Sequence, residues 1–245
     1  MSEASYIKPN WPAPSTVKGF VSTRKGGVSR PPLNTLNLGG HVGDEPQAVA
    51  TNRGQFARQI NMPENVVWLN QVHGTEVVSL PTNEQIDSAD AAYSKSIGQV
   101  CAVLTADCLP VFFCDLAGQQ VAVAHAGWRG LCAGVLESTL AEFDEPKQVM
   151  AWLGPAIGPS AFEVGQEVYE AFCARDVSAH VAFKVISEGK WLADLYALAR
   201  QRLELAGVER IYGGDYCTYT DEERFFSYRR DGQTGRMASV VWIEA

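Results

Sequence analysis

The sequence predicts a fold of the mixed α and β type, in which helices pack on the outside of mixed sheets. Its 245 residues, 46% of them hydrophobic and only 20% charged, are enough to bury a substantial core. Short β-branched or apolar runs are intermixed with segments of helical spacing. Several of these runs follow one another with no room for a crossover helix, which argues against a regular doubly wound sheet. We expect one domain that spans residues 1–245.

The predicted strands are short runs rich in β-branched or apolar side chains, such as KGFVST near the N-terminus and MASVVWIE near the C-terminus. Turn-forming residues bound most of them. They cover residues 18–23, 65–70, 75–80, 99–105, 119–125, 148–154, 208–214 and 237–244.

The predicted helices are segments in which apolar residues recur three or four positions apart. In the last of these segments, Leu195, Leu198 and Leu203 fall on one face, and Gly207 provides a plausible stop. The segments cover residues 46–60, 130–143, 165–176 and 191–207.

The composition argues against several classes of protein. The formal net charge of -8 argues against nucleic acid as the main partner, because that binding is driven by phosphate neutralisation. No stretch approaches the roughly 18 apolar residues of a membrane span, and no basic region followed by an apolar run marks a signal peptide. The six cysteines lie in apolar runs without C-x-x-C spacing, so we expect reduced thiols and a cytoplasmic protein. We predict no obligate protein partner.

Three side chains that can bind a metal stand at the ends of predicted strands. His73 in NQVHG and His125 in AVAHAG each end an apolar run, with a glycine one or two positions later, and Cys108 ends the run QVCAVLTADC. Strand ends often carry catalytic and metal-binding side chains. Zinc accepts nitrogen and sulfur ligands, and a catalytic zinc keeps three protein ligands and one open position. His73, Cys108 and His125 would suit such a site.

The same residues allow other interpretations. Histidines at strand ends are commonly hydrogen-bonded core or surface residues, and cysteine is often simply buried. Cys108 can also be a nucleophile, with His73 or His125 as the base that takes its proton and Asp107 as the group that orients this base. Asp107 reaches the pocket of Cys108 only if the chain turns there, which Pro110 favours. A carboxylate that caps backbone amides is the alternative role for Asp107.

Arginines beside glycines or at the ends of apolar runs are candidates for anion binding. Arg24 lies in STRKGGVS, Arg129 in HAGWRG and Arg229 in FFSYRRDGQTG. Guanidinium groups bind phosphate or carboxylate with two hydrogen bonds, and glycine-rich turns expose backbone N–H groups to the same anion. His41, in the loop NLGGHVGD, is a further candidate. Solvated surface arginine and a plain glycine turn are the alternative interpretations.

Nearly the whole chain carries an ordered series of motifs: STRKGGVS, LNLGGHVGD, NQVHG, TADCLPV, AHAGWRG, WLGPAIGP, GGDYCTY and FFSYRRDGQTGRMAS. In this combination the sequence resembles the laccase-domain family, which is also called multicopper polyphenol oxidase-like, purine nucleoside phosphorylase or, in some bacteria, peptidoglycan editing factor. The resemblance implies a zinc ion held by His73, Cys108 and His125. It also implies a four-layer α/β/β/α sandwich with mixed sheets, similar to a group of cysteine hydrolases.

The resemblance also implies a substrate class. Activities attributed to the family are phosphorolysis of purine nucleosides, namely adenosine, inosine and methylthioadenosine, and hydrolytic deamination of adenosine. Zinc would activate the water for deamination, with Asp107 as a proton carrier, and Arg24, Arg129 and Arg229 would hold phosphate for phosphorolysis. The expected partners are therefore a nucleoside or nucleotide-linked small molecule and phosphate.

Other functions also come with the resemblance. Some bacterial members are said to remove a misincorporated amino acid from a UDP-MurNAc peptidoglycan precursor, and such an amidase would use zinc or a Cys108–histidine pair. A true multicopper oxidase needs many histidines, often as H-x-H pairs, whereas this chain has four and no such pair, so that chemistry is excluded. A single copper ion in the same site, and hence a copper-dependent polyphenol oxidase, is a minor alternative. The third class of function is non-enzymatic: a structural metal site in which His41 or Cys217 is the fourth protein ligand.

Overall fold

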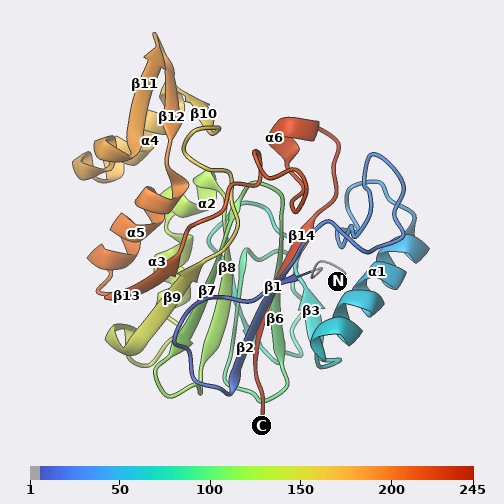
Figure 1. Ribbon diagram of the computed structural model, residues 1–245. Helices are drawn as coiled ribbons and strands as arrows, with labels where there is room; N and C mark the ends of the chain where they lie inside the picture. The colour runs from blue at the N-terminus through green and yellow to red at the C-terminus, as the bar shows by residue number, and fades with distance from the viewer. Residues whose placement is uncertain (1–5) are drawn as a thin grey trace.

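The strands of the computed structural model, which describes residues 6–245, form two large sheets and one small sheet (Figure 1). Part of the N-terminal stretch in which no signal peptide is expected lies outside the described residues. The first sheet has the order β1–β2–β14–β6–β3, and its only parallel pair is β3–β6. Its strands are β1 (Tyr6–Ile7), β2 (Val17–Ser22), β14 (Met237–Ile243), β6 (Val100–Thr105) and β3 (Val66–Trp68).

The second sheet has the order β13–β9–β7–β8–β5–β4. The pairs at its two edges, β13–β9 and β4–β5, are parallel, and the pairs between them are antiparallel. This sheet is therefore mixed, as expected. Its strands are β13 (Arg210–Gly213), β9 (Val149–Leu153), β7 (Leu109–Asp115), β8 (Val121–Ala126), β5 (Ala91–Ser94) and β4 (Val77–Leu80).

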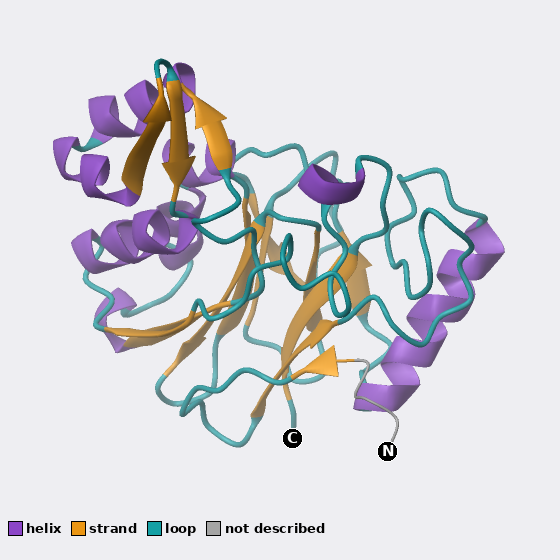
Figure 2. Cartoon of the chain, turned by 45° about the horizontal axis from the view of Figure 1, so that its top comes forward, coloured by secondary structure: helices purple, strands orange, loops and turns teal. Residues whose placement is uncertain are grey.

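The small third sheet stands at one end of the molecule beside helices (Figure 2). It is antiparallel and consists of β10 (Glu163–Gly165), β12 (Lys190–Ala193) and β11 (Phe183–Ser187). The helices are α1 (Pro46–Ile60), α2 (Trp128–Ala133), α3 (Val135–Leu140), η1 (Pro146–Gln148), α4 (Gln166–Arg175), η2 (Val177–Ala182), α5 (Leu195–Leu205) and α6 (Tyr228–Asp231).

The two large sheets pack face to face with helices on both outer sides, which confirms the four-layer arrangement (Figure 1). Alternate residues of one strand face different layers, as the twofold repeat of a strand requires. Val103 of β6 lies in the cluster between the sheets, whereas Ala102 and Leu104 lie in the cluster that includes Phe56 of α1. Because both faces are covered, the central strands appear in the sequence as continuous apolar runs.

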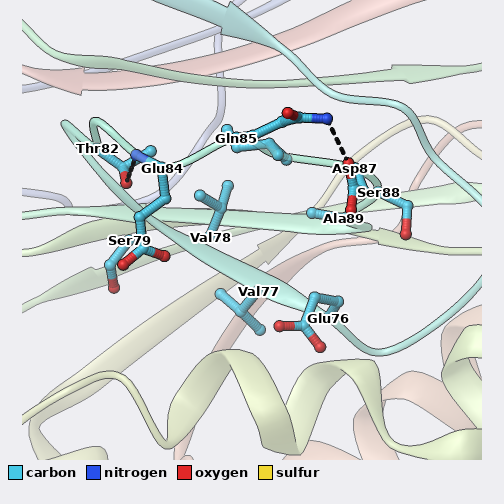
Figure 3. Close-up of a pocket in the computed structure, with 11 residues that line it drawn as sticks. Glu76, Val77, Val78, Ser79, Thr82, Glu84, Gln85, Asp87, Ser88 and Ala89 are labelled. Atoms are coloured by element: carbon cyan, nitrogen blue, oxygen red, sulfur yellow. Dashed lines mark hydrogen bonds between the residues drawn. The ribbon is translucent and has the colours of Figure 1, made fainter.

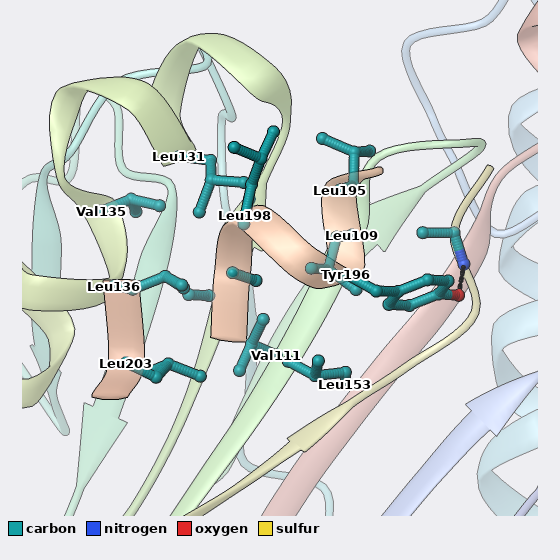
Figure 4. Packing of buried hydrophobic residues seen from close by; sticks show 14 of the residues in the cluster. Leu109, Val111, Leu131, Val135, Leu136, Leu153, Leu195, Tyr196, Leu198 and Leu203 are labelled. Atoms are coloured by element: carbon teal, nitrogen blue, oxygen red, sulfur yellow. Dashed lines mark hydrogen bonds between the residues drawn. The ribbon is translucent and has the colours of Figure 1, made fainter. Parts of the chain in front are cut away.

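The helices α2, α3 and α5 cover the outer face of the second sheet. Figure 4 shows leucines of these helices, such as Leu131, Leu136 and Leu198, packed against the strand residues Val111 and Leu153. All five side chains are buried. This packing fixes the strands whose ends carry His125 and Cys108.

The predicted strands and helices are all present, with a few differences at their boundaries. The segment predicted as one helix over 130–143 is two short helices, because Gly134 interrupts it in a left-handed conformation with φ of 114°. The last predicted helix begins only at Leu195, since residues 190–193 pair in β12 and Asp194 caps the helix. Strands β1, β5, β7, β10, β11 and β12 and the short helices η1, η2 and α6 were not predicted.

Among residues 6–245, no helix is both long enough and apolar enough to cross a membrane.

Candidate metal centre

Asp90, a fully buried carboxylate, holds the loop that carries His73. His73 has a left-handed backbone with φ of 62°. Its N–H donates to Oδ1 of Asp90 at 2.9 Å, and the N–H groups of Val72 and Gly74 donate to Oδ2 at 3.1 and 2.7 Å. Burial raises the pKa of Asp90, but hydrogen bonds from His125, Gly74 and Val72 outweigh it, so the pKa is lowered. Asp90 is therefore an ionised anchor for this loop.

His125, near the end of β8, is oriented by the same carboxylate. Its Nδ1 atom lies 2.8 Å from Oδ1 of Asp90, so an N–H there donates to the carboxylate and Nε2 is left to bind a metal. The rings of His125 and His73 lie edge to face with centroids 4.8 Å apart. One buried aspartate thus places both histidines.

Cys108 lies in the turn between β6 and β7, where Asp107 has a φ of 83°. Its Sγ atom is 3.8 Å from Nε2 of His73. Burial raises the pKa of the Cys108 thiol, but His125 and His73 outweigh this effect and lower the pKa to about 6. Burial lowers the pKa of His125, but Cys108 and Asp90 raise it to about 9. The metal-free pair therefore favours a thiolate beside an imidazolium.

The three side chains fit a metal ion with one open position. Their donor atoms all lie within 4.8 Å of one another. Tetrahedral zinc with bonds of about 2.0 to 2.3 Å places nitrogen and sulfur donors about 3.6 Å apart, and the 3.8 Å between Cys108 and His73 comes close to this value. Within the described part of the chain the group has three members, which include neither His41 nor Cys217. This donor set suits zinc and is also compatible with copper.

Two glycines at the start of α2 allow this close approach. A Cβ atom on Gly127 would lie 2.8 Å from Cδ2 of His73 and 3.0 Å from Sγ of Cys108. A Cβ atom on Gly130 would lie 2.8 Å from the carbonyl oxygen of Gly74. The glycines of the motif AHAGWRG are therefore needed where the three metal-binding segments meet.

A cavity of about 360 Å³ adjoins the three side chains. One wall is rigid, because the amide of Gln71 exchanges two hydrogen bonds with the backbone of Leu104, at 2.8 and 2.7 Å. Burial, followed by Arg236 and other cations, lowers the pKa of His41, so this imidazole is neutral at pH 7. The cavity is lined by His41, Gln71, His73, Leu104, Thr105, Ala106, Cys108, His125, Tyr228 and Arg236.

The three arginines predicted to bind phosphate are not among the residues that line this cavity. Arg24 donates to the carbonyl oxygen of Asn34 at 3.3 and 3.2 Å. The guanidinium of Arg129 lies 4.3 Å from the ring centroid of Trp128. Arg229 donates to a backbone carbonyl of β10 at 2.7 Å. Of the predicted substrate-binding residues, the structure brings only His41 to the cavity.

Asp107 connects the Cys108 turn to the C-terminal part of the chain. Its Oδ1 accepts a hydrogen bond from the hydroxyl of Thr218, and its Oδ2 accepts one from the backbone N–H of Arg229, both at 2.6 Å. These contacts match the capping interpretation of this residue. A proton-carrying role for Asp107 stays a prediction.

Sequence reasoning missed four residues of the site. Asp90 in SADAAY precedes a short alanine-rich strand and shows no recognisable signal. Gln71 lies two positions before His73, close enough to be suspected. Arg236 and Tyr228 both lie in the motif FFSYRRDGQTGRMAS, where the adjacent arginines 229 and 230 are the stronger local indication of an anion site.

A second hollow of about 540 Å³ runs along β4 and the loop that follows it (Figure 3). Polar groups of its rim bond to one another, as when Gln85 donates to Asp87 at 2.8 Å. Its lining contains no histidine, cysteine, lysine or arginine, so it lacks the metal donors and the cation that line the cavity at the metal centre.

Comparison with known proteins matches residues 18–244 to the family described as Multi-copper polyphenol oxidoreductase laccase. The chain is 60% identical over 241 residues to a protein of Escherichia coli (strain K12) named Purine nucleoside phosphorylase YfiH, and the match covers 97% of this chain and 98% of that protein. It is 51% identical over 241 residues to a Haemophilus influenzae protein named Purine nucleoside phosphorylase, with 97% and 99% covered.

Solved structures share the same fold. Neisseria meningitidis protein NMB0706 superimposes with a TM-score of 0.94 at 51% identity, over 99% of this chain and 100% of that one. YlmD from Geobacillus stearothermophilus superimposes with a TM-score of 0.91 at 28% identity, over 100% of this chain and 98% of that one.

Proposed function

The chain belongs to the multi-copper polyphenol oxidoreductase laccase family, as its motifs indicated, and we propose that it is a zinc-dependent enzyme of purine nucleosides. Its reactions are phosphorolysis of adenosine, inosine and methylthioadenosine, and hydrolytic deamination of adenosine. The names of the curated relatives support this substrate class. The observation that carries the proposal is a group of three metal donors, His73, Cys108 and His125, in the wall of a cavity of about 360 Å³.

A bound zinc ion supplies Lewis acidity toward an oxygen or nitrogen atom of the substrate. The chain contributes the position and charge of the donors. Asp90 fixes the tautomer of His125 so that Nε2 is the free nitrogen, and it holds the His73 loop through three backbone hydrogen bonds. Cys108 contributes a thiolate, which its lowered pKa favours.

The cavity offers surfaces for a nucleoside. The side chains of Leu104 and Ala106 form an apolar wall of the cavity, and the exposed ring of Tyr228 offers an aromatic face for the purine.

Both reactions end with a proton on the leaving nitrogen. In phosphorolysis a phosphate oxygen bonds to C1′ of the ribose, the C1′–N9 bond breaks, and its electron pair leaves with the base. In deamination a water oxygen bonds to C6 and ammonia leaves. Because His41 lines the cavity with a neutral imidazole, we assign to it, ahead of Asp107, the transfer of the proton that the attacking phosphate or water loses to the leaving nitrogen.

An amidase is the second candidate, and one specific observation favours it. Asp90, His125 and Cys108 form a chain of contacts in which the carboxylate orients the imidazole and the imidazole stabilises the thiolate. This is the arrangement of an activated cysteine nucleophile. Such an enzyme releases an amino acid from a nucleotide-linked cell-wall precursor and needs no metal.

Product analysis separates these functions. The zinc-loaded protein is incubated with adenosine, with and without phosphate, beside a His125→Ala control. We expect adenine only when phosphate is present, inosine in both cases, and neither product from the control. Unchanged adenosine in every sample contradicts the nucleoside enzyme. Activity on the cell-wall precursor that survives metal removal but is lost in Cys108→Ala favours the amidase.

A further inference from the structure

Arg236 is the only lysine or arginine among the residues that line the metal cavity. The protein carries a formal net charge of -8, so an anion is not drawn to this cavity by the charge of the whole molecule. A negatively charged co-substrate must therefore be held by a local cation. The three arginines predicted for this role bond or stack outside the lining, which leaves Arg236 as the candidate.

One edge of the Arg236 guanidinium is free of protein acceptors. Its Nη1 atom donates to the backbone carbonyls of Thr234 and Gly235 at 2.9 and 3.0 Å. Among residues 6–245, no acceptor is bonded to Nε or Nη2, and no carboxylate forms an ion pair with the side chain. The Nε–Nη2 edge presents two parallel N–H groups, the geometry that binds two oxygens of a phosphate.

The stem of Arg236 is held in a narrow passage. Its backbone N–H donates to Oδ1 of Asn37 at 2.9 Å, and its carbonyl oxygen accepts from Leu38 at 3.1 Å. A Cβ atom on Gly39 would lie 2.8 Å from Cγ of Arg236 and 3.0 Å from its Cβ. Gly39 therefore gives the arginine room to reach the cavity, and the bonds of Nη1 fix the direction of the guanidinium.

We propose that Arg236 binds inorganic phosphate through its Nε–Nη2 edge, so that this side chain forms the phosphate subsite next to the metal centre. This inference rests on the proposed function. The bound phosphate supplies the oxygen that bonds to C1′ while the C1′–N9 bond breaks, and the base leaves with the electron pair and gains the proton that the phosphate loses. Hydrolytic deamination uses water in place of phosphate, so it depends on Arg236 less.

The test measures adenine release by the zinc-loaded protein as a function of phosphate concentration. We expect Arg236→Gln to raise the KM for phosphate about tenfold to a hundredfold. Arg236→Lys keeps the positive charge but loses the two parallel N–H groups of the guanidinium, so it should raise the KM for phosphate less. Gly39→Ala displaces the arginine without removing it and should also raise the KM. Arg210→Gln, which removes an exposed arginine of β13, is the charge-matched control and should leave the KM unchanged.

Inosine formation without phosphate, measured in the same variants, shows whether the metal centre and the fold are intact. An equal loss of inosine and adenine formation in Arg236→Gln overturns the inference, because Arg236 would then act on the nucleoside or the metal. An unchanged KM for phosphate, or a raised KM in Arg129→Gln instead, overturns it as well.

If the wild-type protein forms neither product, the proposed function fails, and calorimetric titration with inorganic phosphate then tests Arg236 by itself. Phosphate binding that is present in the wild type and lost in Arg236→Gln supports the subsite. Binding that is equal in both proteins, or absent from both, overturns it.

Discussion

Replacing Asp90 with asparagine tests whether one buried carboxylate organises the metal centre. Asp90 accepts four hydrogen bonds, from the N–H groups of Val72, His73 and Gly74 and from Nδ1 of His125. Asparagine keeps one acceptor oxygen and turns the other into a donor, so two of these four donors lose their acceptor.

The magnitude follows from those two lost bonds. An unsatisfied buried donor costs about 1–3 kcal/mol, so the free energy of unfolding of the metal-free protein should fall by about 2–6 kcal/mol. For a chain of this size each kcal/mol lowers the unfolding temperature by about 2–4 °C. Loss of the carboxylate behind a metal-binding histidine should weaken zinc binding about tenfold to a hundredfold.

The assay combines thermal unfolding with competition for zinc against a chelator. Asp115→Ala is the matched control, because Asp115 is also buried and accepts two backbone hydrogen bonds, but it does so in the turn between β7 and β8. It should lower stability and leave zinc affinity unchanged. Wild-type zinc affinity in Asp90→Asn would refute the reasoning.

Three further predictions follow from the geometry of the site and core. The rate of alkylation of Cys108 in the metal-free protein, followed by mass spectrometry, should increase as the pH rises through about 6, because the lowered pKa of the thiol makes the thiolate form there. A midpoint of the rate increase near pH 9 contradicts this. Gly127→Ala should lower the zinc affinity at least about tenfold, because the added Cβ would lie 3.0 Å from Sγ of Cys108. Gly40→Ala is the control and should leave the affinity unchanged, because a Cβ there would meet open space. Competition with a chelator measures the zinc affinity of both variants. Phe112→Ala empties a fully buried position between the sheets and should lower the free energy of unfolding, measured with denaturant, by about 3–5 kcal/mol. A loss under about 1 kcal/mol contradicts the packing.

The strands and helices with strong hydrophobic patterns could be predicted from the sequence, whereas those shaped by tertiary contacts could not. The apolar run of β6 was recognisable because both of its faces are buried. Strand β5 is only four residues long and begins with two alanines, which favour no strand on their own. In β7, Pro110 lacks a backbone N–H and indicates a turn, yet its carbonyl oxygen accepts from Gly154 inside the sheet.

The metal donors could be predicted for a different reason than the rest of the site. His73, Cys108 and His125 have side chains whose chemistry is rare in the sequence. Cys108 and His125 stand at strand ends as expected, whereas His73 lies in the loop between β3 and β4. Their convergence depends on two sheets packing together, which only the resemblance to a family anticipated. Asp90 and Arg236 carry common side chains, and their roles depend on which groups lie within hydrogen-bonding distance. Local sequence patterns do not indicate those distances.

The most direct test of the central claim, that three side chains hold a zinc ion on which nucleoside chemistry depends, is a titration of activity with metal. Metal-free protein receives zinc in steps, and phosphate-dependent adenine release from adenosine is measured at each step. Our account predicts negligible activity without metal and a linear rise to a plateau at one zinc per chain. Full activity in the metal-free protein, or a rise that continues beyond one equivalent, would contradict it.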